Sequence, residues 1–142
     1  MVIGLIGENC SGKSTLAAHI RDVIGAEVVT GRDYLRMAKS EAEARRLFRE
    51  KLAGAVSGSN IIYVISEPDQ LDLLPDGAVR ILVSADLDTI KARFRARMRG
   101  FLPAPVERML EGKHGVFDHC AYDYQYDGAN GDATALCEKL TQ

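Results

Sequence analysis

Short segments rich in β-branched and aromatic residues alternate along the chain with longer segments whose apolar residues recur at helical spacing. Continuous apolar runs or a period of two are typical of strands, and a period near 3.6 is typical of helices. The strand pattern is found at residues 2–6, 27–30, 61–65, 79–83 and 122–126. The helical pattern is found at residues 13–24, 40–56, 87–98, 106–113 and 133–140.

Strands that alternate with helices need crossover connections, and these connections produce a mostly parallel sheet. The first predicted strand is wholly apolar apart from one glycine, as expected for a strand that is buried on both faces. We therefore expect an α/β fold with three layers, in which helices cover both faces of a five-stranded sheet. The length of 142 residues, without repeats or linkers, predicts a single domain over residues 1–142.

The composition is that of an ordinary globular protein, with 46% hydrophobic and 27% charged residues. The cysteines Cys10, Cys120 and Cys137 are too few and too scattered for a disulfide framework or a paired zinc site, which indicates a reducing, cytoplasmic setting. The first residues contain no basic leader, and no apolar run approaches the roughly 18 residues of a membrane span. We expect a soluble protein without a membrane partner.

The net charge of −2 conceals a gradient along the chain. Residues 1–79 carry 9 basic and 11 acidic groups, residues 80–113 carry 8 and 4, and residues 114–142 carry 1 and 5. A short basic stretch in a mildly acidic protein suits a compact polyanion such as a triphosphate. It disfavours nucleic acid as a partner, because nucleic acid requires a broad basic surface.

A glycine-rich sequence separates the first predicted strand from the first predicted helix. It matches the pattern G-x-x-x-x-G-K-[ST] with Gly7, Glu8, Asn9, Cys10, Ser11, Gly12, Lys13 and Ser14. The glycines permit torsions and close approaches that a side chain would prevent, so that backbone N–H groups can surround a phosphate. The first turn of the helix adds further N–H donors and the positive end of its dipole.

The residues at the end of this loop complete a site for a nucleoside triphosphate. Lys13 is placed to bridge β- and γ-phosphate oxygens, and Ser14 to bind Mg²⁺. Thr15 is placed to contact the α-phosphate. The alternative is a strand-to-helix turn that contains this sequence by chance, and for Cys10 a redox role competes with that of an ordinary loop residue. The flanking strand and helix favour a site that takes ATP and Mg²⁺ as cofactors.

With this loop and this order of elements, the chain resembles the small P-loop kinases, a group that includes nucleoside monophosphate kinases such as adenylate kinase, and shikimate kinase. The segment 30–36 is similar to the Thr-Gly-Asp-x-x-Arg with which adenylate kinases hold their acceptor, with one extra residue before Asp33. The resemblance implies that Thr30, Asp33 and Arg36 face a small-molecule phosphate acceptor. There, an Asp can take a hydroxyl proton or hold Mg²⁺, and an Arg can grip an anion. The alternative is that Asp33 caps a helix and Arg36 is solvated.

Two arginines follow the fourth predicted strand at a spacing of one helical turn. Arg93 and Arg97 share one face of the predicted helix and resemble the R-x-x-x-R of kinase lids. The resemblance implies that Arg93 stacks on the adenine, that Arg97 meets the phosphates, and that Arg108 contacts the transferring phosphoryl group within a lid around residues 99–113. Arg95 and Arg99 fall on another face and are expected in solvent.

The third predicted strand ends differently from that of adenylate kinases. It continues with Ser66, Glu67, Pro68 and Asp69 instead of the Gly-x-Pro-Arg that holds AMP, which argues against AMP as the acceptor. In the family that the chain resembles, an acidic residue at the position of Glu67 commonly supports Mg²⁺ or its water. The alternative for Glu67 is an ordinary turn residue.

The resemblance also implies the strand order 2-3-1-4-5 and a phosphotransferase that moves the γ-phosphoryl group of ATP to a small metabolite. The expected acceptor is a nucleoside monophosphate or a related nucleotide. Catalysis would rest on Lys13, Asp33, Arg97 and Arg108, mainly through positioning and charge stabilisation. The alternatives are a nucleotide-hydrolysing switch, although no clear Asp-x-x-Gly follows the third strand, and a nucleotide-binding protein without turnover.

Overall fold

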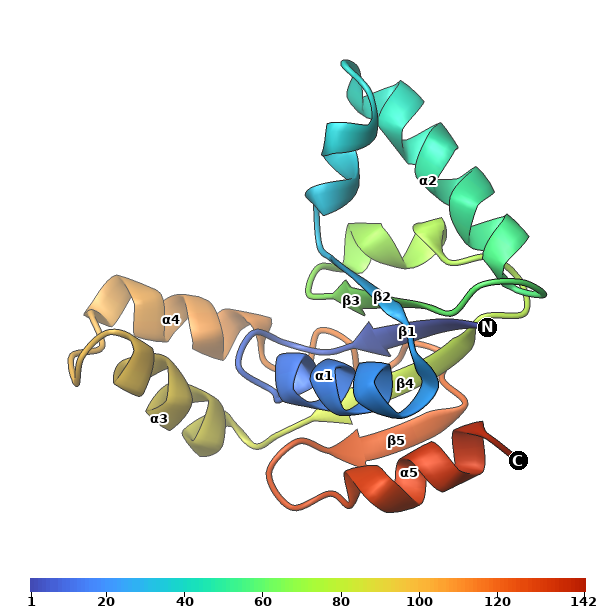
Figure 1. Cartoon of the computed structure of the whole chain (residues 1–142). Helices are drawn as coiled ribbons and strands as arrows, with labels where there is room; N and C mark the ends of the chain where they lie inside the picture. Colours follow the sequence, from blue (N-terminus) through green and yellow to red (C-terminus); the bar gives the residue numbers. More distant parts are fainter.

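A five-stranded sheet forms the centre of the computed structural model, which describes residues 1–142 (Figure 1). All neighbouring strands are parallel and lie in the order β2-β3-β1-β4-β5. The strands are β1 (Val2–Ile6), β2 (Glu27–Thr30), β3 (Ile61–Ile65), β4 (Val79–Ser84) and β5 (Tyr124–Asp127). The expected α/β class and the expected strand order are therefore confirmed.

Helices cover both faces of this sheet, which gives the three expected layers (Figure 1). On one face, α1 (Lys13–Ile24) and α5 (Ala133–Leu140) bury their apolar residues against the strands. On the other face lie α2 (Glu41–Ala55) and two 3₁₀ helices, η1 (Asp33–Met37) and η2 (Pro68–Leu73).

Alternation along β1 lets a single strand contribute to both cores. Val2 and Ile6 belong to the core beneath α2, whereas Ile3 and Leu5 belong to the core beneath α1 and α5. All four side chains are fully buried, because successive residues of a strand point to opposite faces of the sheet. β1 is thereby fixed at the centre of the sheet, and so is the start of the loop that follows it.

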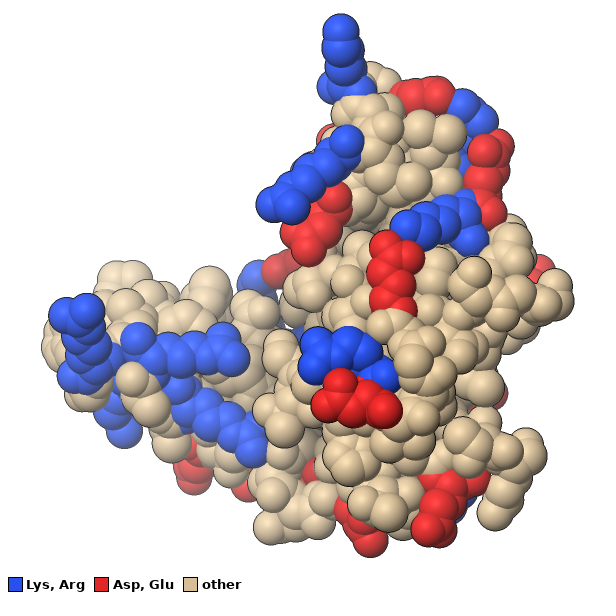
Figure 2. Space-filling model, in the orientation of Figure 1, with Lys and Arg blue, Asp and Glu red and all other residues tan.

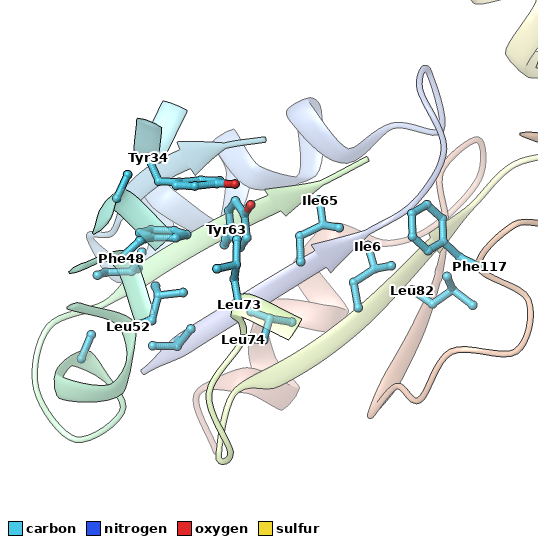
Figure 3. Packing of buried hydrophobic residues seen from close by; sticks show 14 residues of the cluster. Ile6, Tyr34, Phe48, Leu52, Tyr63, Ile65, Leu73, Leu74, Leu82 and Phe117 are labelled. Atoms are coloured by element: carbon cyan, nitrogen blue, oxygen red, sulfur yellow. The ribbon is translucent and has the colours of Figure 1, made fainter. Parts of the chain in front are cut away.

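An aromatic group anchors α2 and η1 to the sheet (Figure 3). Phe48 of α2 stacks on Tyr34 of η1 with ring centroids 5.3 Å apart, and it meets Tyr63 of β3 edge to face at 4.9 Å. Such pairs add about 0.5–1.5 kcal/mol beyond the burial of area. The Tyr63 hydroxyl donates to the carbonyl oxygen of Gly31 at 2.7 Å, so that the turn after β2 is tied to this core.

The helices α3 (Leu87–Arg97) and α4 (Ala104–Lys113) form an antiparallel pair that projects from the sheet (Figure 1). We call residues 87–113 the α3–α4 arm. Figure 2 shows that Lys and Arg side chains gather on it. The sequence predicted both helices, although α4 begins two residues before the expected start at residue 106.

Ion pairs and a small apolar cluster hold the α3–α4 arm together. Lys91 of α3 lies 3.1 Å from Glu107 and 2.7 Å from Glu111, which are both on α4. The buried residues of the cluster are Cys10, Ile90, Leu102 and Leu110. Because Cys10 belongs to the predicted phosphate loop, the arm is packed directly against that loop.

Two further details depart from the sequence prediction. β5 begins at Tyr124 instead of residue 122, and the Asp123 before it is bound to Arg80 twice: its backbone nitrogen donates to the Arg80 carbonyl oxygen at 2.8 Å, and its carboxylate accepts from the Arg80 backbone nitrogen at 2.8 Å. The helix η2 was not predicted, and the buried side chain of Gln70 stabilises its start by accepting hydrogen bonds from two preceding backbone nitrogens. None of the helices is both long enough and apolar enough to cross a bilayer.

Candidate functional site

The predicted phosphate loop, residues 7–14, joins the carboxyl end of β1 to α1. Cys10 and Gly12 have positive φ angles of 65° and 112°. Left-handed backbone of this kind occurs in the concave turns whose N–H groups bind anions. α1 starts without a side-chain cap and without an acidic residue in its first turn. Its first N–H groups and the positive end of its dipole are therefore available to an anion.

The loop lies so close to the sheet that its first residue must be glycine. A Cβ at Gly7 would collide with the carbonyl oxygen of Val83 and would lie 2.7 Å from Oγ of Ser11. Ser11 is buried, and its Oγ has no hydrogen-bond partner within the protein. A buried hydroxyl without a partner is costly, so its position beneath an anion-binding turn fits a site that a ligand completes.

Lys13 is the first residue of α1 and is only 5% exposed. Its ammonium group donates hydrogen bonds to the carbonyl oxygens of Gly7 at 2.6 Å and Glu8 at 2.7 Å. The pKa of Lys13 is lowered from 10.5 to about 8, mainly by burial and to a smaller extent by the nearby charge of Arg97. Two cations therefore face the same space, and an anion placed there would reduce the free-energy cost of burying Lys13.

A cavity of about 420 Å³ opens in front of the loop, a volume within the range of small-ligand sites. Four regions of the chain line it: the loop with the start of α1, the ends of β2 and β3, the helix α3, and the turn after β5. The lining residues are Asn9, Cys10, Gly12, Lys13, Ser14, Thr15, Thr30, Val64, Ser66, Arg93, Arg97 and Gly128. All but Val64, Ser66 and Gly128 were predicted as site residues.

The predicted arginines of the α3–α4 arm differ in their surroundings. Arg93 donates to the carbonyl oxygens of Cys10 at 3.0 Å and Gly128 at 2.8 Å, so its guanidinium group is fixed by two backbone segments. Arg97 lines the cavity one helical turn further along, and no hydrogen bond or ion pair restrains it. Arg108 is exposed on α4 and lies outside the cavity.

Of the predicted acceptor residues, only Thr30 lines the cavity. Asp33 and Arg36 are exposed on η1, and Asp33 lines a separate hollow between β2 and α2. The packing of η1 explains this placement. Tyr34 turns into the core and stacks on Phe48. Because this contact fixes the orientation of η1, Asp33 and Arg36 are left on its exposed sides.

Two glutamates beside the cavity are bound to the end of α4. Oε1 of Glu67 lies 2.8 Å from Nζ of Lys113. Oε1 of Glu8 lies 3.0 Å from Nδ1 of His114, and Oε2 of Glu8 accepts a hydrogen bond from the backbone nitrogen of Gly115 at 3.2 Å. Glu67 therefore has a cationic partner within the protein, and no group of three or more His, Cys, Asp or Glu side chains is arranged to hold a metal ion.

No protein-family model and no curated protein sequence matches the chain. Solved structures match it over nearly its whole length. A sugar kinase from Janibacter sp. HTCC2649 has a TM-score of 0.65 and 19% identity, over 98% of this chain and 91% of that chain. Shikimate kinase from Acinetobacter baumannii has a TM-score of 0.64 and 17% identity, over 99% and 90%. The YorR protein from Bacillus subtilis, in complex with phosphorylated GDP, has a TM-score of 0.64 and 21% identity, over 99% and 94%. The chain has the fold of the small P-loop kinases.

In this P-loop kinase fold, the turn after β5 contributes to the cavity, a contribution that the sequence did not predict. Gly128 lines the cavity, and its carbonyl oxygen binds Arg93. A Cβ at position 128 would collide with the carbonyl oxygen of Ser11, so the turn and the phosphate loop are in direct backbone contact. The available signal was the pair Asp127-Gly128 at the end of a strand, which is a common turn sequence.

Gly128→Ala is expected to weaken the binding of MgATP at least tenfold and to lower the melting temperature of the protein by several degrees. The added methyl group must push the turn after β5 away from the phosphate loop, a distortion that typically costs about 1–3 kcal/mol. In a chain of this length, each kcal/mol corresponds to roughly 3–5 °C. Calorimetry with and without MgATP measures both effects.

Gly54→Ala is the matched control for this substitution. Gly54 lies in α2, and a Cβ at this position would meet no atom within 4 Å. Alanine there should preserve or slightly raise the melting temperature, because it lowers the entropy of the unfolded chain. If Gly128→Ala behaved like Gly54→Ala in both measurements, the contact between the turn and the phosphate loop would have no energetic importance.

Proposed function

We propose that this protein is a kinase that transfers the γ-phosphoryl group of ATP to a small molecule. The observation that carries the proposal is the cavity onto which the buried Lys13, the amino end of α1 and Arg97 all face. The likeness of the fold to that of small P-loop kinases supports it. Lys13 at the start of α1 and Arg97 on α3 place positive charge on two sides of the cavity. This arrangement suits a triphosphate, because charge moves among its oxygens as the terminal phosphoryl group is transferred.

In this proposal, the phosphates bind to the N–H groups of residues 7–14 and of the first turn of α1. Lys13 exchanges its two loop carbonyl oxygens for β- and γ-phosphate oxygens, and Thr15 contacts the α-phosphate. The hydroxyl group of Ser14 would hold Mg²⁺ together with phosphate oxygens and water, and the metal would neutralise charge on the phosphates. Arg93 would lie beside the nucleotide on the α3 side of the cavity, and the resemblance implies that it stacks on the adenine.

The transfer forms one bond and breaks another. A hydroxyl oxygen of the acceptor bonds to the γ-phosphorus while the bond from that phosphorus to the β,γ-bridging oxygen breaks. ADP leaves with the electron pair, and the hydroxyl proton passes to a carboxylate or to water. Arg97 and Arg108 would stabilise the transferring phosphoryl group when residues 99–113 close over the cavity as a lid.

The roles that the resemblance assigns on the acceptor side stay predictions. Asp33 as a base and Arg36 as an anion-binding residue both require η1 to move towards the cavity when the acceptor binds. Glu67 as a support for Mg²⁺ requires it to leave Lys113. A nucleotide as the acceptor is likewise a prediction that rests on the resemblance alone.

An assay of ADP release tests the proposed function. Without an acceptor, the release of ADP from MgATP is expected to be slow, because a kinase protects the γ-phosphate from water until its acceptor completes the site. The correct small molecule is expected to raise the rate at least tenfold. Rapid release of ADP that no acceptor changes would favour a hydrolysing switch, and MgATP binding without release under any condition would favour a binding protein.

A further inference from the structure

A second, smaller hollow of about 70 Å³ adjoins the cavity. Glu8 and Asn9 of the phosphate loop, Ser66 and Glu67 after β3, and Leu110 and Lys113 of α4 contribute to its wall. Asn9 and Ser66 also line the large cavity, so the two spaces share a boundary. A molecule seated in the hollow would therefore lie beside the phosphates of a nucleotide in the cavity.

The charged groups of this hollow are the carboxylates of Glu8 and Glu67 and the ammonium group of Lys113. Glu8 has a side chain only 16% exposed, and His114 and the Gly115 backbone nitrogen orient its two oxygens. Glu67 is 42% exposed and bound on one oxygen by Lys113. Each carboxylate has further lone pairs that can accept hydrogen bonds from a ligand.

Cations that could bind a second anion are absent from this wall or already paired. No arginine lines the hollow. Arg45 of α2 binds both carboxylate oxygens of Asp72 at 2.8 and 3.0 Å, and Arg49 binds the same residue at 2.9 Å. Arg36 lines neither the hollow nor the cavity. A phosphate or carboxylate group in the hollow would face two carboxylates and a single cation, Lys113, which is already paired with Glu67 and cannot bind an anion through a bidentate fork.

We propose that this hollow binds the reacting end of the acceptor and that it selects a hydroxyl-bearing molecule without a phosphate or carboxylate group. The inference rests on the proposed kinase function and specifies its substrate class. Hydroxyl groups donate hydrogen bonds to Glu8 and Glu67, and an amino group on the acceptor would be attracted by them as well. Anionic acceptors would be repelled by the same two carboxylates, so on this inference the hollow disfavours the nucleoside monophosphate that the resemblance implies.

The test compares matched acceptors that differ in a single anionic group. ADP release from MgATP is measured with nucleosides and their monophosphates, and with neutral sugars, amino sugars and polyols beside the corresponding sugar acids and sugar phosphates. We expect uncharged or amino-bearing members to raise the rate at least tenfold and their anionic counterparts to raise it less than twofold.

The substitution Glu67→Gln tests whether this selectivity arises in the hollow. With the best acceptor, the variant is expected to raise the KM for that acceptor at least tenfold and the KM for ATP much less, whereas the competing role of Glu67 as a support for Mg²⁺ would raise mainly the KM for ATP. Glu107→Gln is the control, since Glu107 is also a glutamate paired with a lysine but lies on the arm, outside the hollow. Glu8→Gln provides a second variant in case Glu67→Gln fails to fold.

The outcomes distinguish this inference from the proposed function beneath it. Stimulation by phosphorylated or carboxylated acceptors alone would overturn the inference and leave the kinase function intact. A KM for the acceptor that rises equally in Glu67→Gln and Glu107→Gln would show that the hollow is not the acceptor site. No stimulation by any member of the panel, with MgATP binding preserved, would overturn the kinase function and the inference with it.

Discussion

Replacing Lys13 with methionine is expected to abolish the stabilisation of the protein by MgATP and at the same time to stabilise the nucleotide-free protein. At a nucleotide concentration of about 100 times Kd, binding raises the free energy of unfolding by about 2.7 kcal/mol, and the variant should lose nearly all of this increment. The lowering of the Lys13 pKa from 10.5 to about 8 corresponds to a loss of roughly 3 kcal/mol in the free energy of unfolding of the nucleotide-free protein. Methionine carries no charge, so the variant should not suffer this loss.

The pH dependence separates this effect from a gain in packing. A lysine whose pKa is lower in the folded state destabilises that state fully below about pH 8, and the penalty disappears as the pH rises towards 10.5. The difference in free energy of unfolding between Lys13→Met and the unchanged protein should therefore shrink between pH 8 and pH 10.5. Chemical denaturation at a series of pH values measures it.

Lys39→Met is the matched control, because Lys39 is exposed and lies outside the cavity. It should change neither the nucleotide-free stability nor the response to MgATP. Equal stabilisation of Lys13→Met and the unchanged protein by MgATP would contradict the phosphate site itself. A Lys13→Met protein that is less stable than the unchanged one at pH 7 would contradict the cost assigned to the buried charge.

Arg97→Ala is expected to lower kcat on the order of 10³-fold while the Kd for MgATP changes less than threefold. Arg97 faces the cavity, but no hydrogen bond or ion pair restrains it, so its interaction with the phosphates would mature only when residues 99–113 close and charge develops on the transferring group. Arginines that meet a transferring phosphoryl group are typically worth about 10³–10⁵ in kcat.

Arg95→Ala is the control for Arg97→Ala. Arg95 is an exposed arginine on the same helix that does not line the cavity, so its removal tests the loss of a positive charge from α3 alone. Steady-state kinetics with a stimulating acceptor, together with calorimetric binding of MgATP, give the two constants. If Arg97→Ala reduced affinity and turnover equally, Arg97 would bind the nucleotide equally before and during the reaction and would not stabilise the transfer step specifically.

The sequence predicted the central part of the site because its signals are local. The strand before the loop, the glycines within it and the helix after it are consecutive in the chain, and each has its own physical signature. The spacing of Arg93 and Arg97 likewise reports a shared helical face. The structure places both arginines at the cavity wall, as that spacing requires.

The remaining parts depend on contacts between distant segments, which periodicity does not encode. Asp33 was expected beside the acceptor, but the inward turn of Tyr34 onto Phe48 determines which way η1 faces, and this contact exists only after α2 has packed. The position of Gly128 against Ser11 depends on the alignment of β5 with β4. The pairing of Glu67 with Lys113 arises from an arm that returns to the phosphate loop.

The two hydrogen bonds of Arg93 also have a consequence for the order of events during synthesis. They connect Arg93 to carbonyl groups 83 residues earlier and 35 residues later in the chain. β1 is synthesised before its partners in the sheet, which begin at Ile61 and Val79, and before the turn with Gly128 that contacts the phosphate loop. The phosphate loop is therefore synthesised well before the segments that complete its surroundings. A nucleotide is therefore expected to stabilise the finished protein, whose site is complete, rather than a chain in which the turn with Gly128 is not yet in place.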